Sequence, residues 1–275
     1  MPEPTQRRVV DADRERVTEL LDVATEAALA GGALLRARFE AGREARVASK
    51  TTPTDPVSEA DLESQREIRA LLRRRRPQDG FLAEEEGADQ AGSSGLRWVV
   101  DPLDGTVNFL YGIPQWSVSV AVCDAQGALV GVIHAPISGE TFTARRGELP
   151  TRNGVELQWR GDVAPAMSQA LIATGFAYQA GVRAEQAQLL TRLLPLVRDI
   201  RRFGSASMDL AWTAMGRYDA YFERGVKLWD IAAGALVCEC VGLLAREIEG
   251  GILVSPPSLL ESLVEIVGYR GGAST

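Results

Sequence analysis

A strand-like apolar run that stops at two aspartates constrains this sequence more than any other segment: Trp98-Val-Val-Asp-Pro-Leu-Asp-Gly-Thr-Val-Asn-Phe109. Pro102 fixes one of its own backbone angles and restricts Asp101 to extended geometry. Gly105 permits a turn that a β-carbon could block. Asp101 and Asp104 are therefore expected to project from a rigid turn, where two like charges repel unless a cation lies between them. Oxygen ligands with no His or Cys nearby favour Mg²⁺ over Zn²⁺, although both aspartates could instead cap backbone N–H groups.

Two further acidic segments lie far from this one in the chain. Phe81-Leu-Ala-Glu-Glu-Glu86 runs from an apolar strand into three carboxylates, and Leu228-Trp-Asp-Ile-Ala-Ala-Gly234 places Asp230 at the start of an apolar helix. Each also has an ordinary structural interpretation, the first as a solvated charge cluster and the second as a helix N-cap. The start of a helix favours anions, and Gly204-Ser-Ala206 begins another helix with the same implication.

The spacing of apolar residues changes near residue 160. Helical patterns at 16–41 and 59–75 precede short β-rich segments separated by turn residues, which predict an antiparallel or mixed sheet. Beyond residue 160, strands and helices alternate as they do in α/β layers. We therefore expect an α+β or α/β fold, with an N-terminal half (1–160) that carries the acidic turn and a C-terminal half (161–275) that completes the site. The later helices are expected at 183–197, 205–215, 229–241 and 257–267, and the later strands at ALIATGF, YDAYF and GILVS.

The composition is that of an ordinary globular protein, with 45% hydrophobic and 24% charged residues. A net charge of −7 disfavours nucleic acid as a partner. No run approaches the roughly 18 apolar residues of a membrane span, and the N-terminus lacks the apolar core of a signal peptide. We therefore expect a cytoplasmic protein with no membrane partner.

WVVDPLDGTVNF resembles the first signature of the inositol monophosphatase family, and LWDIAAGALV resembles the second. Residues 50–61, KTTPTDPVSEAD, are similar to the family's Lys-x-x-x-x-Asp-x-Val-Thr-x-x-Asp segment. FLAEEE, RRFGSASMDL and DAYFERGVKLWD also match in order, so that the resemblance covers residues 16–268. It implies the layered α-β-α-β-α sandwich of the inositol monophosphatase and fructose-1,6-bisphosphatase type.

The resemblance also implies roles for individual residues. Two or three Mg²⁺ ions would be held by Glu84, Asp101, Asp104, Asp230 and the Leu103 carbonyl. Asp61 and Thr106 would orient and deprotonate the attacking water, with Glu84 as a third catalytic residue, and Lys50 would add a charge beside the metals. The substrate would contact Glu84, Leu103, Asp104, Gly105, Thr106, Arg201, Gly204, Ser205, Ala206, Glu223 and Asp230.

Such a site would hydrolyse a phosphate monoester by direct attack of water, with the metal offsetting the charge of the phosphate. A phosphohistidine route has little support, because the single histidine, His134, lies in a strand-like run away from every motif. A serine hydrolase is also disfavoured, because the chain lacks a nucleophile-elbow motif. The resemblance further implies inhibition by Li⁺ and a homodimer.

The substrate stays open, because one fold of this kind hosts several phosphatase activities. Glu223 together with residues 204–206 favours inositol monophosphate or a similar polyol phosphate, and Lys227 is expected to alter that pocket. Histidinol-phosphate phosphatase is the nearest alternative enzyme. A non-catalytic, protein-binding relative is the rival from another class, although the complete set of acidic residues favours catalysis.

Overall fold

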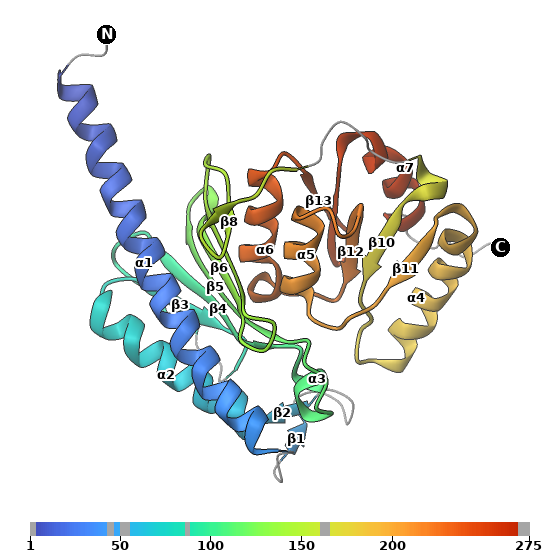
Figure 1. Cartoon of the computed structure of the whole chain (residues 1–275), viewed down its shortest axis with the longest axis horizontal. Coiled ribbons are helices and arrows are strands. Elements are labelled where there is room, and N and C mark those ends of the chain that lie inside the picture. The colour runs from blue at the N-terminus through green and yellow to red at the C-terminus, as the bar shows by residue number, and fades with distance from the viewer. Residues whose placement is uncertain (1–3, 43–46, 50–55, 86–88, 160–165, 269–275) are drawn as a thin grey trace.

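The computed structural model describes residues 4–42, 47–49, 56–85, 89–159 and 166–268 of the 275-residue chain. Its elements stack in the order helix, sheet, helix, sheet, helix (Figure 1). Helices α1 and α2 cover the outer face of the first sheet, α5 and α6 lie between the two sheets, and α4 and α7 cover the second sheet. The predicted α-β-α-β-α sandwich is therefore confirmed.

The first helical layer consists of α1 (Pro4–Ala41) and α2 (Glu59–Arg75). The helical pattern predicted from residue 16 begins earlier, at Pro4, whereas the second helix has both predicted ends. A β-carbon on Gly32 would overlap the ring of His134, so glycine lets α1 lie close against the sheet. No helix among the described residues is long and apolar enough to cross a membrane.

The first sheet is mixed, as the sequence predicts, because β3 runs parallel to β4 and each later neighbour is antiparallel. Its seven strands follow chain order from β3 to β9. The ladder between β4 and β5 shifts register between Asp101 and Asp104, which marks the start of the acidic turn. The strands are β3 (Gly80–Ala83), β4 (Arg97–Asp104), β5 (Ser117–Asp124), β6 (Gly127–Ala135), β7 (Glu140–Arg145), β8 (Thr151–Arg152) and β9 (Val155–Glu156).

The second sheet has five strands in the order β11-β10-β12-β14-β13. The helix predicted at 183–197 spans Ala180–Leu193 instead, and a short 3₁₀ turn follows it at Leu194–Leu196. Pro195 has no N–H to continue the α-helical ladder, which accounts for the earlier end. The strands are β10 (Leu171–Thr174), β11 (Asp199–Arg201), β12 (Ala220–Arg224), β13 (Leu244–Ile248) and β14 (Gly251–Ser255), and the helices beside them are α4 (Ala180–Leu193) and α7 (Pro257–Val267).

Central helices α5 (Ala206–Ala214) and α6 (Leu228–Cys240) lie within one residue of their predicted ends. One hydrophobic cluster contains Val99 of β4 together with Leu236 of α6 and Val254 of β14, so the two sheets share a core through these helices. The division of the chain into two halves near residue 160 stays a prediction, and residues 160–165 lie outside the described residues.

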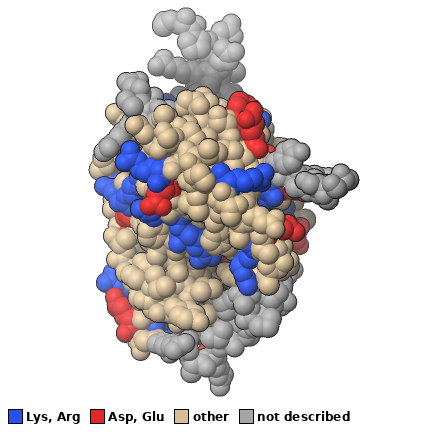
Figure 2. Space-filling view, turned by 90° about the vertical axis from the view of Figure 1, so that its right-hand side faces the viewer, with Lys and Arg blue, Asp and Glu red and all other residues tan. Residues whose placement is uncertain are grey.

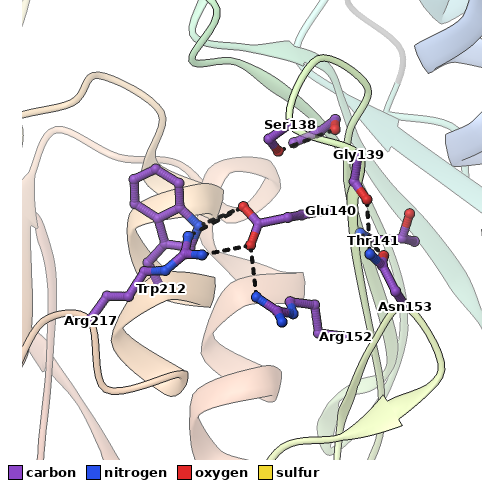
Figure 3. A network of polar contacts seen from close by, with 9 residues as sticks. Ser138, Gly139, Glu140, Thr141, Arg152, Asn153, Trp212 and Arg217 are labelled. Atoms are coloured by element: carbon purple, nitrogen blue, oxygen red, sulfur yellow. Dashed lines mark hydrogen bonds and ion pairs between the residues drawn. The ribbon is translucent and has the colours of Figure 1, made fainter.

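A polar contact ties the edge of the first sheet to α5 (Figure 3). Glu140, at the start of β7, accepts hydrogen bonds from Trp212 Nε1 (3.1 Å) and from the Arg217 guanidinium (3.0 Å). Arg152 Nη1 lies 3.3 Å from the same carboxylate. Because Glu140 is buried, these three donors keep its charge compensated while it holds α5 against the sheet.

Two smaller elements complete the fold near the acidic turn. Strands β1 (Val47–Ser49) and β2 (Pro56–Ser58) form an antiparallel pair, and β2 leads directly into α2. Helix α3 (Thr106–Leu110) begins immediately after Gly105.

Candidate active site

A cavity of roughly 690 Å³ contains all four carboxylates that the sequence predicts as metal ligands. Glu84 follows strand β3, Asp101 and Asp104 belong to the end of β4, and Asp230 lies in the first turn of α6. Glu84 and Asp230 are 146 positions apart in the chain, yet both line this cavity. The other lining residues are Glu85, Leu103, Gly105, Thr106, Phe176, Ala177, Tyr178, Gln179, Val182, Arg202, Gly204, Ala206, Glu223, Arg224, Gly225, Val226, Lys227 and Trp229.

The turn after β4 has the geometry that its sequence predicts. Asp101 Oδ1 accepts a hydrogen bond from the Leu103 N–H at 2.9 Å, which fixes the carboxylate at the end of β4, just before the turn. Gly105 adopts a left-handed conformation with φ of 101°, and a β-carbon there would lie 3.1 Å from the Gln115 carbonyl and 3.2 Å from the Gly204 carbonyl. Glycine is therefore required at 105 by both backbone angle and space.

The Asp104 carboxylate is directed at the start of α5. Asp104 Oδ2 accepts from the Ser207 N–H (2.7 Å), the Ser207 hydroxyl (2.6 Å) and the Ser205 hydroxyl (2.8 Å), and Oδ1 accepts from the Ala206 N–H (3.1 Å). Burial raises the pKa of Asp104, and these hydrogen bonds act in the opposite direction. Asp104 thus supplies the cap that α5 lacks from its own N-cap residue, Ser205.

Asp61 and Thr106, which the resemblance pairs, lie within hydrogen-bonding distance of each other. The Thr106 hydroxyl oxygen lies 2.9 Å from Asp61 Oδ1 and 3.1 Å from the Leu103 carbonyl oxygen. Asp61 is completely buried, and its Oδ2 accepts from the Ser58 N–H (2.9 Å) and hydroxyl (2.5 Å) in the capping box of α2. The start of α2 therefore fixes the Asp61 carboxylate beside Thr106.

Asp230 and Glu84 approach the cavity from different layers. Burial raises the pKa of Asp230 well above its usual value, and the negative charge of Glu84 raises it further. Asp230 Oδ2 accepts a hydrogen bond from the Lys227 N–H at 2.5 Å, so this carboxylate also caps the start of its own helix. A negative charge that raises the pKa of Asp230 in this way favours a cation at the same place.

The four carboxylates offer only oxygen atoms as ligands, and oxygen ligands suit a hard divalent ion such as Mg²⁺. As the side chains stand, no group of three or more His, Cys, Asp or Glu residues in the described part of the chain is gathered closely enough to enclose one ion. Asp104 and Asp230 each have a carboxylate oxygen that accepts a hydrogen bond from a backbone N–H group.

The side of the cavity expected to face the alcohol contains Gly204, Ala206 and Glu223. Burial raises the pKa of Glu223 to about 7, and the Tyr221 hydroxyl donates to its Oε2 at 2.9 Å. Glu223 lies directly against Gly175, where any β-carbon would overlap its carboxylate. Ser205 is buried behind the lining and is engaged with Asp104.

Two adjacent arginines before α5 differ in their position relative to the cavity. Arg201 is not among the described lining residues, and its Nη1 forms an ion pair with Asp199 at 2.5 Å. Arg202, which the sequence analysis did not select, does line the cavity. The sequence does not indicate which of the consecutive arginines lines the cavity. The direction of each side chain depends on where β11 ends. Lys50 lies outside the described residues.

The remaining lining is partly apolar and was also missed from the sequence. Phe176, Tyr178 and Trp229 border the cavity from the loop after β10 and from the start of α6.

Basic side chains gather across the middle of the face shown in Figure 2, although the whole chain carries a net charge of −7.

This fold and cavity define the structural class of inositol monophosphatase and SuhB proteins. The structure of the extragenic suppressor protein suhB from Bartonella henselae superposes with a TM-score of 0.84 at 32% identity, covering 92% of this chain and 99% of that one. The chain belongs to the inositol monophosphatase family, whose model matches residues 16–268.

Curated relatives carry two different names. An inositol-1-monophosphatase of Mycobacterium leprae is 40% identical over 233 residues, which cover 79% of this chain and 80% of the relative. A protein named Nus factor SuhB, from Pasteurella multocida, is 37% identical over 233 residues, which cover 84% of this chain and 86% of the relative.

Proposed function

We propose that this chain is a Mg²⁺-dependent phosphomonoesterase that hydrolyses inositol monophosphate, or a similar polyol phosphate, to the alcohol and inorganic phosphate. The observation that carries the proposal is the cavity in which Glu84, Asp101, Asp104 and Asp230 are all lining residues. The name of the Mycobacterium leprae relative, inositol-1-monophosphatase, supports the same activity.

Two or three Mg²⁺ ions would be held by these four carboxylates and the Leu103 carbonyl. When bound, such ions offset the charge of the phosphate dianion, lower the pKa of water and stabilise the leaving alkoxide. Neutralisation of the acidic cavity also explains how a substrate dianion can enter it.

Asp61 and Thr106 are proposed to orient the attacking water and to receive its proton. If the Thr106 hydroxyl donates to Asp61 Oδ1, 2.9 Å away, a lone pair of its oxygen is left to accept from water. The buried Asp61 carboxylate is held by Ser58 and is the final proton acceptor of the pair. The N–H groups of Gly105 and Thr106 are proposed to bind phosphate oxygens.

The alcohol part of the substrate is proposed to contact Gly204, Ala206 and Glu223. A glutamate carboxylate accepts hydrogen bonds from hydroxyl groups, and its fixed position beside Tyr221 supports recognition of a polyol. Inhibition by Li⁺ and a homodimer belong to the same proposal.

A non-catalytic role in a transcription complex is the second candidate, which the name of the Pasteurella multocida relative favours. The two candidate functions differ in whether they require the carboxylates of the cavity. A purely protein-binding relative has no need to keep Asp61, Thr106 and the four lining carboxylates together, so their joint presence supports catalysis.

The decisive experiment is release of inorganic phosphate from a panel of phosphomonoesters, with and without Mg²⁺. Inositol 1-phosphate is expected to be the preferred substrate, and chelation with EDTA is expected to abolish turnover. Preference for histidinol phosphate would replace the proposed substrate. No phosphate release from any ester, together with capture of transcription proteins, would leave the second candidate as the function.

A further inference from the structure

We infer that Arg202 determines specificity for the alcohol part of the substrate, by donating to a hydroxyl group that in turn donates to Glu223. The inference rests on the proposed function and adds a residue to which the sequence analysis gave no role. It also narrows the substrate class, because the two partners have opposite charges.

Arg202 stands between the end of β11 and the start of α5. Its side chain is exposed to solvent and lines the cavity. A β-carbon on Gly204 would lie 2.5 Å from Arg202 Nη1, so the guanidinium rests directly over the Gly204 backbone. Gly204 has φ of 87°, a left-handed conformation in which glycine is favoured, and it thus leaves room for the arginine.

The neighbouring arginines already have protein partners. Arg201 pairs with Asp199 at 2.5 Å, and Arg198 Nε donates to the Gln169 carbonyl at 2.9 Å. Arg202 makes no hydrogen bond or ion pair with any other residue in the described part of the chain. Of these three cations, Arg202 is therefore the one with its donors available to a ligand.

Two carboxylates, the partly buried Glu223 and the buried Asp209, lie close enough to this guanidinium for its charge to act on them. Burial raises the pKa of Glu223 and of Asp209, and the positive charge of Arg202 partly opposes both increases. Neither carboxylate forms a direct ion pair with Arg202, so the groups influence one another without touching. Asp209 is 1% exposed, and its Oδ1 has no hydrogen-bond partner among the described residues.

A gap between a cation and an anion selects a neutral group that both donates and accepts. A hydroxyl group can accept from the Arg202 guanidinium and donate to Glu223 at the same time. A second phosphate drawn to Arg202 would also meet the charge of Glu223 when that carboxylate is ionised, and an amine drawn to Glu223 would also meet repulsion from Arg202. The geometry therefore favours a polyol monophosphate over a bisphosphate or an amino-alcohol phosphate such as histidinol phosphate.

The test compares Arg202→Gln with Arg201→Gln and with the matched control Arg198→Gln, on two substrates. Inositol 1-phosphate carries hydroxyl groups beside its ester, whereas p-nitrophenyl phosphate carries none. Because a hydrogen bond to a charged group contributes about 1.5–3 kcal/mol, Arg202→Gln should lower kcat/KM for inositol 1-phosphate by roughly 10- to 150-fold, mainly through KM. The rate with p-nitrophenyl phosphate should change by less than about threefold, and Arg198→Gln should change neither rate.

Three results would overturn the inference: equal losses on both substrates, no loss on either, or a loss specific to inositol 1-phosphate in Arg201→Gln instead. Calorimetric titration with free inositol adds a measurement that needs no turnover, and Arg202→Gln should weaken this binding by a similar factor. If the wild-type chain released no phosphate from any ester, the proposed function would fail. Turnover with unchanged selectivity in Arg202→Gln would instead refute the role of Arg202 alone.

Discussion

Asp104, at the end of β4, is held to helix α5 by Ser207, whose N–H and hydroxyl both donate to Asp104 Oδ2, at 2.7 Å and 2.6 Å. A residue predicted as a metal ligand therefore also caps the helix that follows the arginine run. The contact spans 103 positions of the chain and fixes the acidic turn against the layer between the two sheets. Substitution at Asp104 consequently affects two properties that must be measured separately.

Asp104→Asn is expected to abolish Mg²⁺-dependent turnover while the protein stays folded. Loss of one ionised oxygen weakens binding of a hard cation, and we expect kcat/KM to fall by at least about 100-fold, the scale seen when a group that stabilises transition-state charge is removed. The amide oxygen still accepts from α5, so the loss of folding free energy should stay near 1 kcal/mol. Phosphate release as a function of Mg²⁺ concentration and a urea denaturation curve measure the two effects.

Ser207→Ala is the matched control for the capping role. It removes one donor to Asp104 and leaves the carboxylate charge, so stability should fall by about 1 kcal/mol and turnover should change only a few-fold. Full activity of Asp104→Asn at low Mg²⁺ would contradict the assigned ligand set.

Thr106→Val is expected to lower kcat by roughly 100-fold with little change in KM, because general-base assistance typically contributes 100-fold or more. Valine fills the same space but breaks the 2.9 Å contact with Asp61. Thr106→Ser keeps the hydroxyl and should restore most of the rate. Steady-state kinetics on inositol 1-phosphate distinguish the two variants, and equal rates for Thr106→Val and wild type would remove Thr106 from the mechanism.

Gly131→Ala is expected to destabilise the protein by about 1–3 kcal/mol through overpacking. A β-carbon on Gly131 of β6 would lie 2.9 Å from the Ala233 backbone of α6, the helix that carries Asp230. Gly181→Ala is the control, since a β-carbon there meets nothing within 4 Å. In helix α4 this change should be neutral or stabilise by up to about 1 kcal/mol. Thermal unfolding of both variants checks the contrast, which would be lost if the two melted alike.

His134 is expected to make folding less stable as pH falls from 6.5 to about 4. Burial lowers its pKa from 6.5 to about 4, and the ring hydrogen-bonds Thr141 Oγ1 at 2.9 Å. Between these pH values the unfolded chain binds a proton that the folded chain does not, so stability rises with pH across this window and falls on acidification. The loss amounts to roughly 3 kcal/mol at about 1.4 kcal/mol per pKa unit. Denaturation of wild type and His134→Gln at several pH values tests this, and parallel curves would refute it.

Local sequence patterns predicted the elements near the site with good accuracy. The apolar run up to Asp101, the glycine turn at Gly105 and the helix that contains Asp230 all occur as expected, because each depends on residues within about ten positions. Helix α4 ends early for a local reason as well, the proline that follows it. Strand β11 was missed because its three residues are mostly polar and gain their pairing only from β10.

Sequence patterns could not decide whether a given residue has a structural role or a role at the site. Asp104 was open to interpretation as a metal ligand or as a backbone cap, and its contact with α5 lies more than 100 positions away in the chain. Arg202 and Arg201 are adjacent and chemically identical, yet one lines the cavity and the other pairs with Asp199. Such differences depend on the direction in which a side chain leaves the backbone at the end of β11.

The sequence by itself determined the family, because its motifs are local properties of the chain, and the resemblance to that family then predicted the layered order of helices and sheets and the candidate site residues. Only the tertiary structure decided that Glu84, Asp101, Asp104 and Asp230 border one cavity, that Asp104 caps α5, and that Arg202 rather than Arg201 lines that cavity. Packing of distant segments sets these relationships, and no short stretch of sequence contains both partners.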